Sequence, residues 1–461
     1  MILPRFTSEG ERDRRFLRSA FAHPGKKSER GSVLVIVIWI CLGLVALTLY
    51  FADSMTSELR AADNRAAEIA ARQAVAGGTR YAAYVLSQYA TDGTVPDFND
   101  YESEELPIGE ASVWFIGRDP SQVAGSDPVF GLVDEASKLN LNTVSRTMLE
   151  ALPNITPELV EAIISWRSRN AAGAGDSTYG RLDPPRVNKG APFESVDELR
   201  LVYGATLDLL FGEDTNRNGV LDDNENDSDR SAPRDNGDGL LQAGILEYVT
   251  VYSREPNTRA NGGRRLNVST AANREQVRPA LRQRFGPARG DQILLAIGSQ
   301  QINSIAEFMV RGRLTADEWS QVRGEITTSN GTTIQGLINV NTASETVLAC
   351  IPGIGIENAA AIAAYRLANP NLQGSFFWLT EVLPPASIIR AGQYLTDRSY
   401  QFSADVAAVG LSGRGYCREM TVFDLIQGTP RIVYHQDLTS YGWALGSQVR
   451  RIVQDARERR T

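Results

Sequence analysis

The sequence predicts an α+β fold: a long N-terminal helix packs on an antiparallel sheet, and the sheet carries a large, mostly helical insertion. Three observations predict it. An uncharged apolar run continues, without a proline, into a stretch whose apolar residues have helical spacing. A short motif recurs in the middle of the chain. Strand-like segments lie on both sides of that repeated region.

Length, charge and cysteine content bound the possible functions. The chain has 461 residues, enough for two or three domains, and its net charge of -8 disfavours nucleic-acid binding. Cys41 lies in the apolar run, whereas Cys350 and Cys417 could either form a disulfide or stay reduced. The two histidines, His23 and His435, exclude a His-rich zinc site and leave only His435 for His-based catalysis.

The apolar run at 32–52 contains no charged residue. As a helix it would span ~30 Å, one bilayer core. The preceding residues, 1–31, carry eight Lys or Arg against four Asp or Glu, which predicts a cytoplasmic N-terminus. The run could be a removable signal peptide, a plain anchor, or the start of a helix retained after cleavage behind Gly31. The absence of proline from 32 to 86 predicts that the membrane helix continues as a soluble helix, which favours cleavage behind Gly31.

This arrangement resembles a type IV pilin-like precursor, in which a basic leader ends in glycine and an apolar helix follows. The resemblance implies that prepilin peptidase cuts between Gly31 and Ser32 and that the new N-terminus is methylated. Most such proteins carry glutamate at the fifth residue after the cut, where this chain has Ile36. That glutamate is thought to neutralise the amine of a neighbouring subunit inside the filament, where an unpaired charge is costly.

A subunit that lacks this glutamate has nothing to pair with a subunit ahead of it, as expected at a filament tip. Within the superfamily, the lack is typical of the large minor pseudopilin of type II secretion, general secretion pathway protein K (the GspK family). The resemblance therefore implies that Ile36 determines placement at the tip.

The body of the chain contains an internal repeat. Residues 139–143, LNLNT, recur as residues 338–342, INVNT, and matching residues follow at the same spacing. A weaker third copy begins at 266–270, LNVST. An acidic-apolar element follows each copy, at 193–199, 302–308 and 378–382. Each unit looks like a helix-hairpin-helix, with Asn142 and Thr143 capping the first helix of the first copy.

A helix-hairpin-helix can be interpreted in two ways. It binds DNA when a glycine-rich hairpin, here 352–355, offers backbone N–H groups to a phosphate. Otherwise it is a compact packing unit. Residues 331–390 carry only two Arg against three Glu, and Asn154 and Thr156 replace the glycines in the first copy. These features favour the packing unit.

Residues 214–225, DTNRNGVLDDNE, match the calcium-loop pattern D-x-[DN]-x-[DN]-G-x5-E at every fixed position. The predicted ligands are the side chains of Asp214, Asn216, Asn218, Asp222 and Glu225 and the backbone carbonyl of Val220. All-oxygen ligands in a flexible loop indicate a structural Ca²⁺ ion, and the resemblance to K pseudopilins implies the same. We expect a helix before the loop, at 201–211, but none after it. A second cluster could hold another ion or be simply solvated: Asp227, Asp229, Asp235 and Asp238.

Strands are expected at 111–117, 129–135, 245–253, 401–409, 419–426 and 431–436. Those that bracket the insertion should pair across it. The predicted organisation is a leader at 1–31, a membrane-spanning and pilin helix at 32–90, pilin-like strands at 91–138, an inserted helical domain at 139–393, C-terminal strands at 394–445 and a charged tail at 446–461.

The leading hypothesis is a non-enzymatic minor pseudopilin that caps the tip of the type II secretion pseudopilus and assists protein export. The expected partners are other minor pseudopilins, the inner-membrane assembly platform, prepilin peptidase and membrane lipid, with no nucleic acid. The expected location is the inner membrane, with a single pass and the bulk of the chain in the periplasm. The alternative is a membrane-anchored DNA receptor of the competence type, which would use the helix-hairpin-helix repeats. A hydrolase is disfavoured because no nucleophile, base and orienting group appear at motif spacing.

Overall fold

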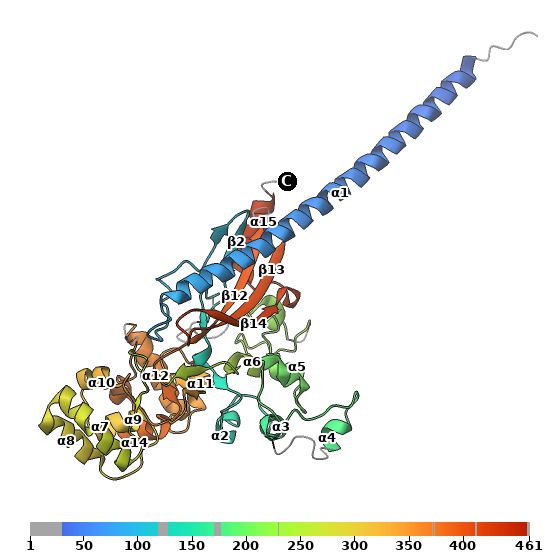
Figure 1. The fold of residues 1–461 in the computed structure, drawn as a ribbon. Helices are drawn as coiled ribbons and strands as arrows, with labels where there is room; N and C mark the ends of the chain where they lie inside the picture. The colour runs from blue at the N-terminus through green and yellow to red at the C-terminus, as the bar shows by residue number, and fades with distance from the viewer. Residues whose placement is uncertain are drawn as a thin grey trace, which may run out of the picture. The chain divides into compact units, whose positions relative to one another are not determined.

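The computed structural model describes residues 30–118, 128–169, 177–228, 230–370, 372, 374–410 and 413–458, with only the backbone at 30–32 and 456–458. The chain forms two compact units, Met1–Ala62 and Asp63–Thr461. A long apolar N-terminal helix, an antiparallel sheet and many short helices make up the described residues, which confirms the predicted α+β fold (Figure 1).

The first helix, α1 (Arg30–Ser87), is unbroken over 58 residues. By length and composition it could cross a membrane, and the side chains of its apolar first half are exposed. Further along, small and apolar side chains on one stripe of α1 are buried: Ala71, Ala74, Val75, Ala82, Val85 and Leu86. Helical spacing therefore gives the second part of α1 a face that packs on the sheet.

The main sheet has six strands and is antiparallel throughout. Its order is β1 (Leu106–Ile108), β2 (Ala111–Phe115), β12 (Gln401–Gly410), β13 (Tyr416–Asp424) and β14 (Arg431–Asp437), and β3 (Val133–Asp134) also pairs with β12. The central strand β12 thus joins strands that precede the insertion to strands that follow it. The predicted pairing across the insertion is confirmed.

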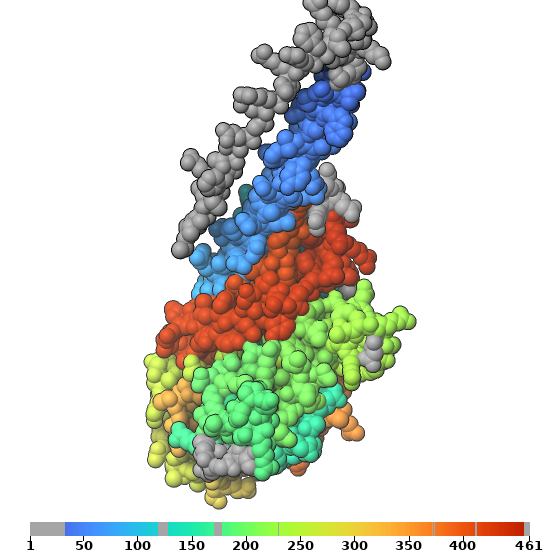
Figure 2. Space-filling view, turned by 90° about the vertical axis from the view of Figure 1, so that its right-hand side faces the viewer, coloured from blue at the N-terminus to red at the C-terminus, as the bar shows by residue number. Residues whose placement is uncertain are grey.

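Both faces of the central strands β2 and β12 are covered. Successive side chains of a strand point to opposite sides, so neighbouring residues enter different cores. Val113, Phe115 and Val406 pack with α1 on one face. On the other face, Trp114 and Ile116 are among the residues covered by the segment that leads into α15 (Gly446–Glu458). In Figure 2 the C-terminal residues, coloured red, lie between the green part of the insertion and the light-blue part of α1.

The insertion contains three repeats, each opened and closed by a parallel pair of two-residue strands. The pairs are β4 (Leu139–Asn140) with β5 (Val249–Thr250), β7 (Leu266–Asn267) with β8 (Ile326–Thr327), and β10 (Ile338–Asn339) with β11 (Leu395–Thr396). The weak third copy in the sequence is therefore a full structural repeat. An antiparallel pair, β6 (Arg254–Pro256) with β9 (Thr333–Gln335), links the segments on either side of the second repeat.

Short helices fill each repeat between its two strands. The first repeat has α2 (Arg146–Leu149), α3 (Pro157–Arg167), α4 (Ser177–Gly180), α5 (Leu207–Phe211) and α6 (Ile245–Tyr248). The second has α7 (Ala271–Phe285), α8 (Pro287–Ile297), α9 (Ile305–Arg311) and α10 (Ala316–Val322). The third has α11 (Glu345–Ala349), α12 (Gly355–Ala368), α13 (Leu379–Val382) and α14 (Pro385–Ala391). Their apolar faces share one hydrophobic core, which contains residues of all three repeats.

An arginine fixes the opening turn of each repeat. Arg167 donates to the carbonyls of Leu141 and Val144 in the first repeat. Arg366 donates to Val340 and Ala343, the equivalent positions of the third repeat, at 3.0 and 2.7 Å. Arg274 donates to Val268 and Ser269 of the second repeat at 3.0 and 3.1 Å. Because a buried carbonyl without a donor is costly, these side chains stabilise the turns.

The helix caps differ from the prediction. Ser145, not Asn142 or Thr143, caps α2, and its hydroxyl accepts from the Met148 amide at 3.3 Å. The preceding residues instead form a turn in which Asn140 Oδ1 accepts from the Asn142 amide at 2.9 Å. That turn delays the start of the helix.

Two further predictions about local structure are wrong. The segment expected to be a strand from 245 begins as helix α6, and only Val249–Thr250 is extended. A short apolar run has no periodicity that separates a buried strand from a buried helix. The helix expected at 201–211 is broken at Gly204, whose φ is 81°, so α5 covers only five residues.

The disulfide that the sequence allowed is not formed, since Cys350 and Cys417 are both free. Cys350 packs in the core of the insertion, whereas Cys417 packs in the core between α1 and the sheet. Burial raises the pKa of the Cys350 thiol to about 12, so the thiol stays protonated and unreactive at neutral pH.

The contact of α1 with the sheet predicts a sharp size limit at Gly78. A Cβ atom there would lie 2.8 Å from Val406 Cγ1 and 3.0 Å from Val113 Cγ1. Gly78→Leu should lower the unfolding free energy of the Asp63–Thr461 unit by about 2 kcal/mol or more, measured by urea unfolding. The control Ala76→Leu, on the exposed side of the same turn, should change it by less than about 0.5 kcal/mol. Equal effects of the two changes would contradict the close packing.

Candidate functional site

The predicted processing residues lie at the start of α1. Gly31 and Ser32 are in its first turn, since the described helix begins at Arg30. Ile36 lies one turn further on and is 57% exposed. The proposed leader up to residue 29 lies outside the described residues. The helix therefore begins beside the expected cleavage position and runs on without interruption into the part that packs on the sheet.

The loop at 214–225 follows α5 in the first repeat and is closed by side chains that accept from its own backbone. Asp214 accepts from the amides of Asn218 and Gly219, both at 2.9 Å. Asn218 Oδ1 accepts from the Val220 amide at 2.7 Å. Gly219 has a φ of 75°, which a glycine adopts without strain. The loop is thus closed by hydrogen bonds between its polar side chains and its own backbone.

The remaining predicted ligand side chains also form hydrogen bonds within the loop. Glu225 accepts from the amides of Thr215 and Asp222 at 3.2 and 3.1 Å. The side-chain amides of Asn216 and Asn218 both donate to Asp222 Oδ2, at 2.6 and 3.1 Å. The structure therefore brings all five predicted ligand side chains together in one loop.

Burial shifts the pKa values of the carboxyl groups in the loop. Glu225 is 1% exposed, and burial together with the charge of Asp214 raises the pKa of its carboxyl to about 8. Burial also raises the pKa of Asp214, although the charge of Arg118 opposes the shift. No Lys, Arg or His in the described residues forms an ion pair with Glu225. A divalent cation beside these carboxyls would favour their ionised forms and so lower their pKa values.

The predicted ligand atoms are carboxylate, amide and carbonyl oxygens, which are the types of atom that calcium binds. Within the described part of the chain, no group of three or more His, Cys, Asp and Glu side chains is already arranged to hold a metal ion. The side-chain amides of Asn216 and Asn218 donate to Asp222, and their oxygens accept from the backbone amides of Asn218 and Val220.

The second acidic cluster is more open. Asp235 Oδ1 accepts from the amides of Ser228 and Gly237 at 2.9 and 2.7 Å. Asp227 and Asp238 accept in the same way from nearby backbone amides. Asp229 lies outside the described residues. These bonds fold the segment on itself, and a second ion there stays a prediction.

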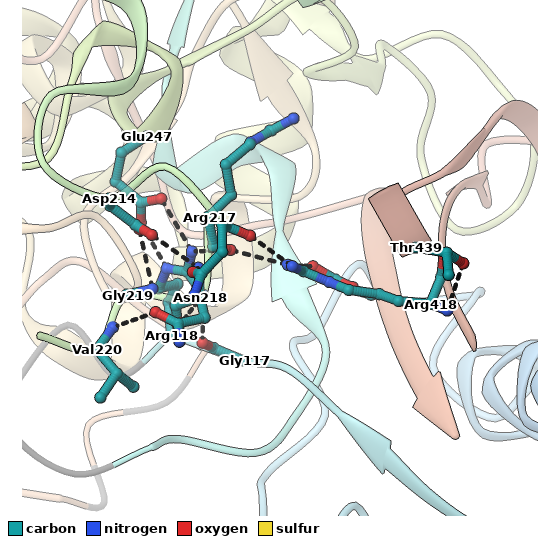
Figure 3. Close-up of polar contacts among 12 residues, drawn as sticks. Gly117, Arg118, Asp214, Arg217, Asn218, Gly219, Val220, Glu247, Arg418 and Thr439 are labelled. Atoms are coloured by element: carbon teal, nitrogen blue, oxygen red, sulfur yellow. Dashed lines mark hydrogen bonds and ion pairs between the residues drawn. The ribbon is translucent and has the colours of Figure 1, made fainter. Parts of the chain in front are cut away.

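The residues that hold the 214–225 loop from outside were not predicted from the sequence. Arg118, which follows β2, and Arg418, on β13, both donate to backbone carbonyls of the loop (Figure 3). Asn216 also donates to the carbonyl of Trp443 at 3.0 Å. The only trace of this in the sequence is a charged residue, Arg418, beside a strand-like apolar run.

Comparison with known proteins adds one observation. No family model matches the chain, and no curated protein matches it. The solved structures that align with it include a chain of the GspK-GspI-GspJ complex from the enterotoxigenic Escherichia coli Type 2 Secretion System, with a TM-score of 0.38 and 11% sequence identity. The alignment covers 83% of this chain and 99% of that chain. No functional conclusion follows from a likeness at this level.

If the 214–225 loop binds calcium, the thermal stability of the protein should depend on calcium. If the ion binds only the folded Asp63–Thr461 unit, excess calcium should raise its melting temperature by roughly 5 °C over the value in EDTA. Glu225→Gln removes a ligand charge and should abolish this difference.

The matched control is Glu213→Gln. Glu213 is also buried and lies beside the loop, but it accepts from the Gln242 amide and is not a predicted ligand. This variant should keep the calcium dependence. Identical melting of the unchanged protein in calcium and in EDTA would count against a structural ion.

Proposed function

We propose that this protein is a non-enzymatic minor pseudopilin of a type II secretion system, anchored in the inner membrane with its bulk in the periplasm. The observation that carries the proposal is α1 itself. One helix begins beside Gly31, runs first as an exposed apolar segment, and then packs through a stripe of small residues on an antiparallel sheet. A subunit built this way can join a helical filament through its apolar half while its sheet holds the outer domain.

The same proposal assigns roles to residues at the start of α1 and to the 214–225 loop. Prepilin peptidase cuts between Gly31 and Ser32, and the apolar helix stays as the new N-terminus. Ile36 leaves the subunit without the glutamate that would pair with a subunit ahead, so the protein caps the tip. Its partners are then other minor pseudopilins and the inner-membrane assembly platform. Its 214–225 loop holds a structural calcium ion.

The contacts of the repeats support a role in packing. The arginines that fix the opening turns of the three repeats donate to carbonyls of those turns, so these N–H groups are not presented to phosphates. In the first repeat, Asn154 has a φ of 58° at the place where the third repeat has Gly353 with a φ of 98°. The hairpin shape is thus kept by a residue other than glycine. A bulky insertion of this kind fits a subunit that blocks further addition above it.

The cleavage proposal predicts the effect of a change at Gly31. Gly31→Leu should leave the precursor uncut in cells that contain the peptidase, because a bulky side chain occupies the position before the scissile bond. Gel mobility of the membrane-bound protein measures this. The control Gly43→Leu, at a glycine where an added Cβ atom would meet nothing within 4 Å, should be cut normally. Normal cleavage of both variants would contradict the junction.

The tip proposal predicts the effect of a charge at residue 36. Ile36→Glu should let the subunit enter the body of the filament, so that more of it is recovered with sheared pseudopili than of the unchanged protein. Ile38→Glu makes the same chemical change two residues further along α1 and should not have this effect. Equal recovery of the two variants would show that residue 36 does not determine placement.

A further inference from the structure

Three successive carbonyls of the 214–225 loop face two arginines: Arg418 on β13, and Arg118, which follows β2. Arg418 donates to the carbonyls of Asn216 and Arg217, the latter at 2.9 Å. Arg118 donates to the carbonyls of Arg217 and Asn218 at 3.0 and 3.2 Å. Figure 3 shows both guanidinium groups reaching the same stretch of loop from different parts of the chain. The backbone of the loop is therefore held from outside, while most hydrogen bonds of its predicted ligand side chains are made within the loop.

Arg418 is a rigid support for this stretch. Its side chain is fully buried, and it pairs with Asp405 of β12 through two hydrogen bonds of 2.8 and 2.6 Å. Burial alone would lower the pKa of the guanidinium, but the charge of Asp405 raises it above its ordinary value. The charge is thus permanent, and the fixed fork geometry of arginine directs the remaining N–H groups at the loop.

Arg118 supports the loop from the end of β2. Its guanidinium pairs with Glu247 of α6 at 2.7 and 3.1 Å and donates to the carbonyl of Gly117 at 2.8 Å. It also packs closely against the loop, since a Cβ atom on Gly219 would lie 2.9 Å from Arg118 Nε. Gly219 therefore matters in two ways: its positive φ shapes the loop, and its lack of a side chain lets Arg118 pack against the loop.

The residue at the centre of the contact has a strained backbone. Arg217 has a φ of 58°, in the left-handed region that residues other than glycine seldom adopt, and its carbonyl accepts from both Arg118 and Arg418. Its neighbours, Asn216 and Asn218, are the two predicted amide ligands. The conformation that places these amides is thus fixed by bonds that come from the sheet.

We propose that Arg118 and Arg418 are positioning residues of the cation loop, which couple cation binding to the docking of the first repeat on the sheet. The proposal rests on the calcium site proposed above. If the guanidiniums hold the loop in its binding conformation, cation binding must in turn strengthen their contact with the sheet, because coupling between two equilibria is reciprocal. The loop then acts as a latch between the insertion and the pilin-like sheet.

The test compares three variants of the full chain in detergent. Arg418→Lys keeps a positive charge opposite Asp405, but a single ammonium group cannot span the contacts of the fork. Arg118→Lys makes the same change at a partly exposed position and serves if the first variant does not fold. Arg274→Lys is the matched control, because Arg274 is also buried and, among the residues that the structure describes, its hydrogen bonds go to carbonyls of the second repeat.

Calcium affinity by titration calorimetry is the readout that a merely structural role would not move. Both Arg418→Lys and Arg118→Lys should weaken calcium binding about tenfold, whereas Arg274→Lys should lower the melting temperature and leave the affinity within about twofold. In the unchanged protein, calcium should also slow amide hydrogen exchange in β12 and β13, which hold no predicted ligand.

Two results would overturn the proposal, and they differ. Unchanged affinity in folded Arg418→Lys or Arg118→Lys would show that the arginines support the fold only, and the calcium loop would stand. Absence of calcium binding to the unchanged protein would remove the calcium site itself and the coupling with it.

Discussion

Five residue pairs between β2 and β12 hold together two parts of the chain that the whole insertion separates. Closing so long a loop costs conformational entropy, but the cost grows only slowly with length, so a sheet can tolerate a large insertion. The pairing requires both ends of the insertion to meet at the sheet. Each repeat meets the same requirement on a smaller scale, because its first and last strands pair in parallel. The insertion and each repeat within it are therefore segments whose two ends are held side by side by strand pairing.

Arginine side chains that donate to backbone carbonyls recur at the joints of this architecture. They fix the opening turn of each repeat and the outer side of the 214–225 loop. Although the chain has a net charge of -8, many of its cations are thus engaged within the fold. This explains how helix-hairpin-helix units can serve as packing modules. The same kind of bond holds the acidic loop beside the sheet, because Arg118 and Arg418 donate to its backbone carbonyls and not to its carboxylates.

The sequence predicted the elements that depend on local pattern. Hydropathy and the absence of proline indicated α1, alternating strands indicated β12 to β14, and spacing indicated the loop and the repeats. It missed what depends on residues far apart: Arg418 meets the loop across about two hundred positions, and no local pattern marks a partner at that separation. The segment after Gly244 was mistaken for a strand for a related reason, since the burial of Ile245 and Leu246 in the insertion core decides its conformation.

The central claim is that the apolar helix is retained as a new N-terminus after the leader is removed. N-terminal sequencing and intact mass of the protein purified from membranes test it most directly. We expect a mature chain that begins at Ser32, carries a methyl group on its amine and keeps the whole of α1 from that residue. A mature chain that still begins at Met1, or one that begins beyond the apolar run at 32–52, would contradict it.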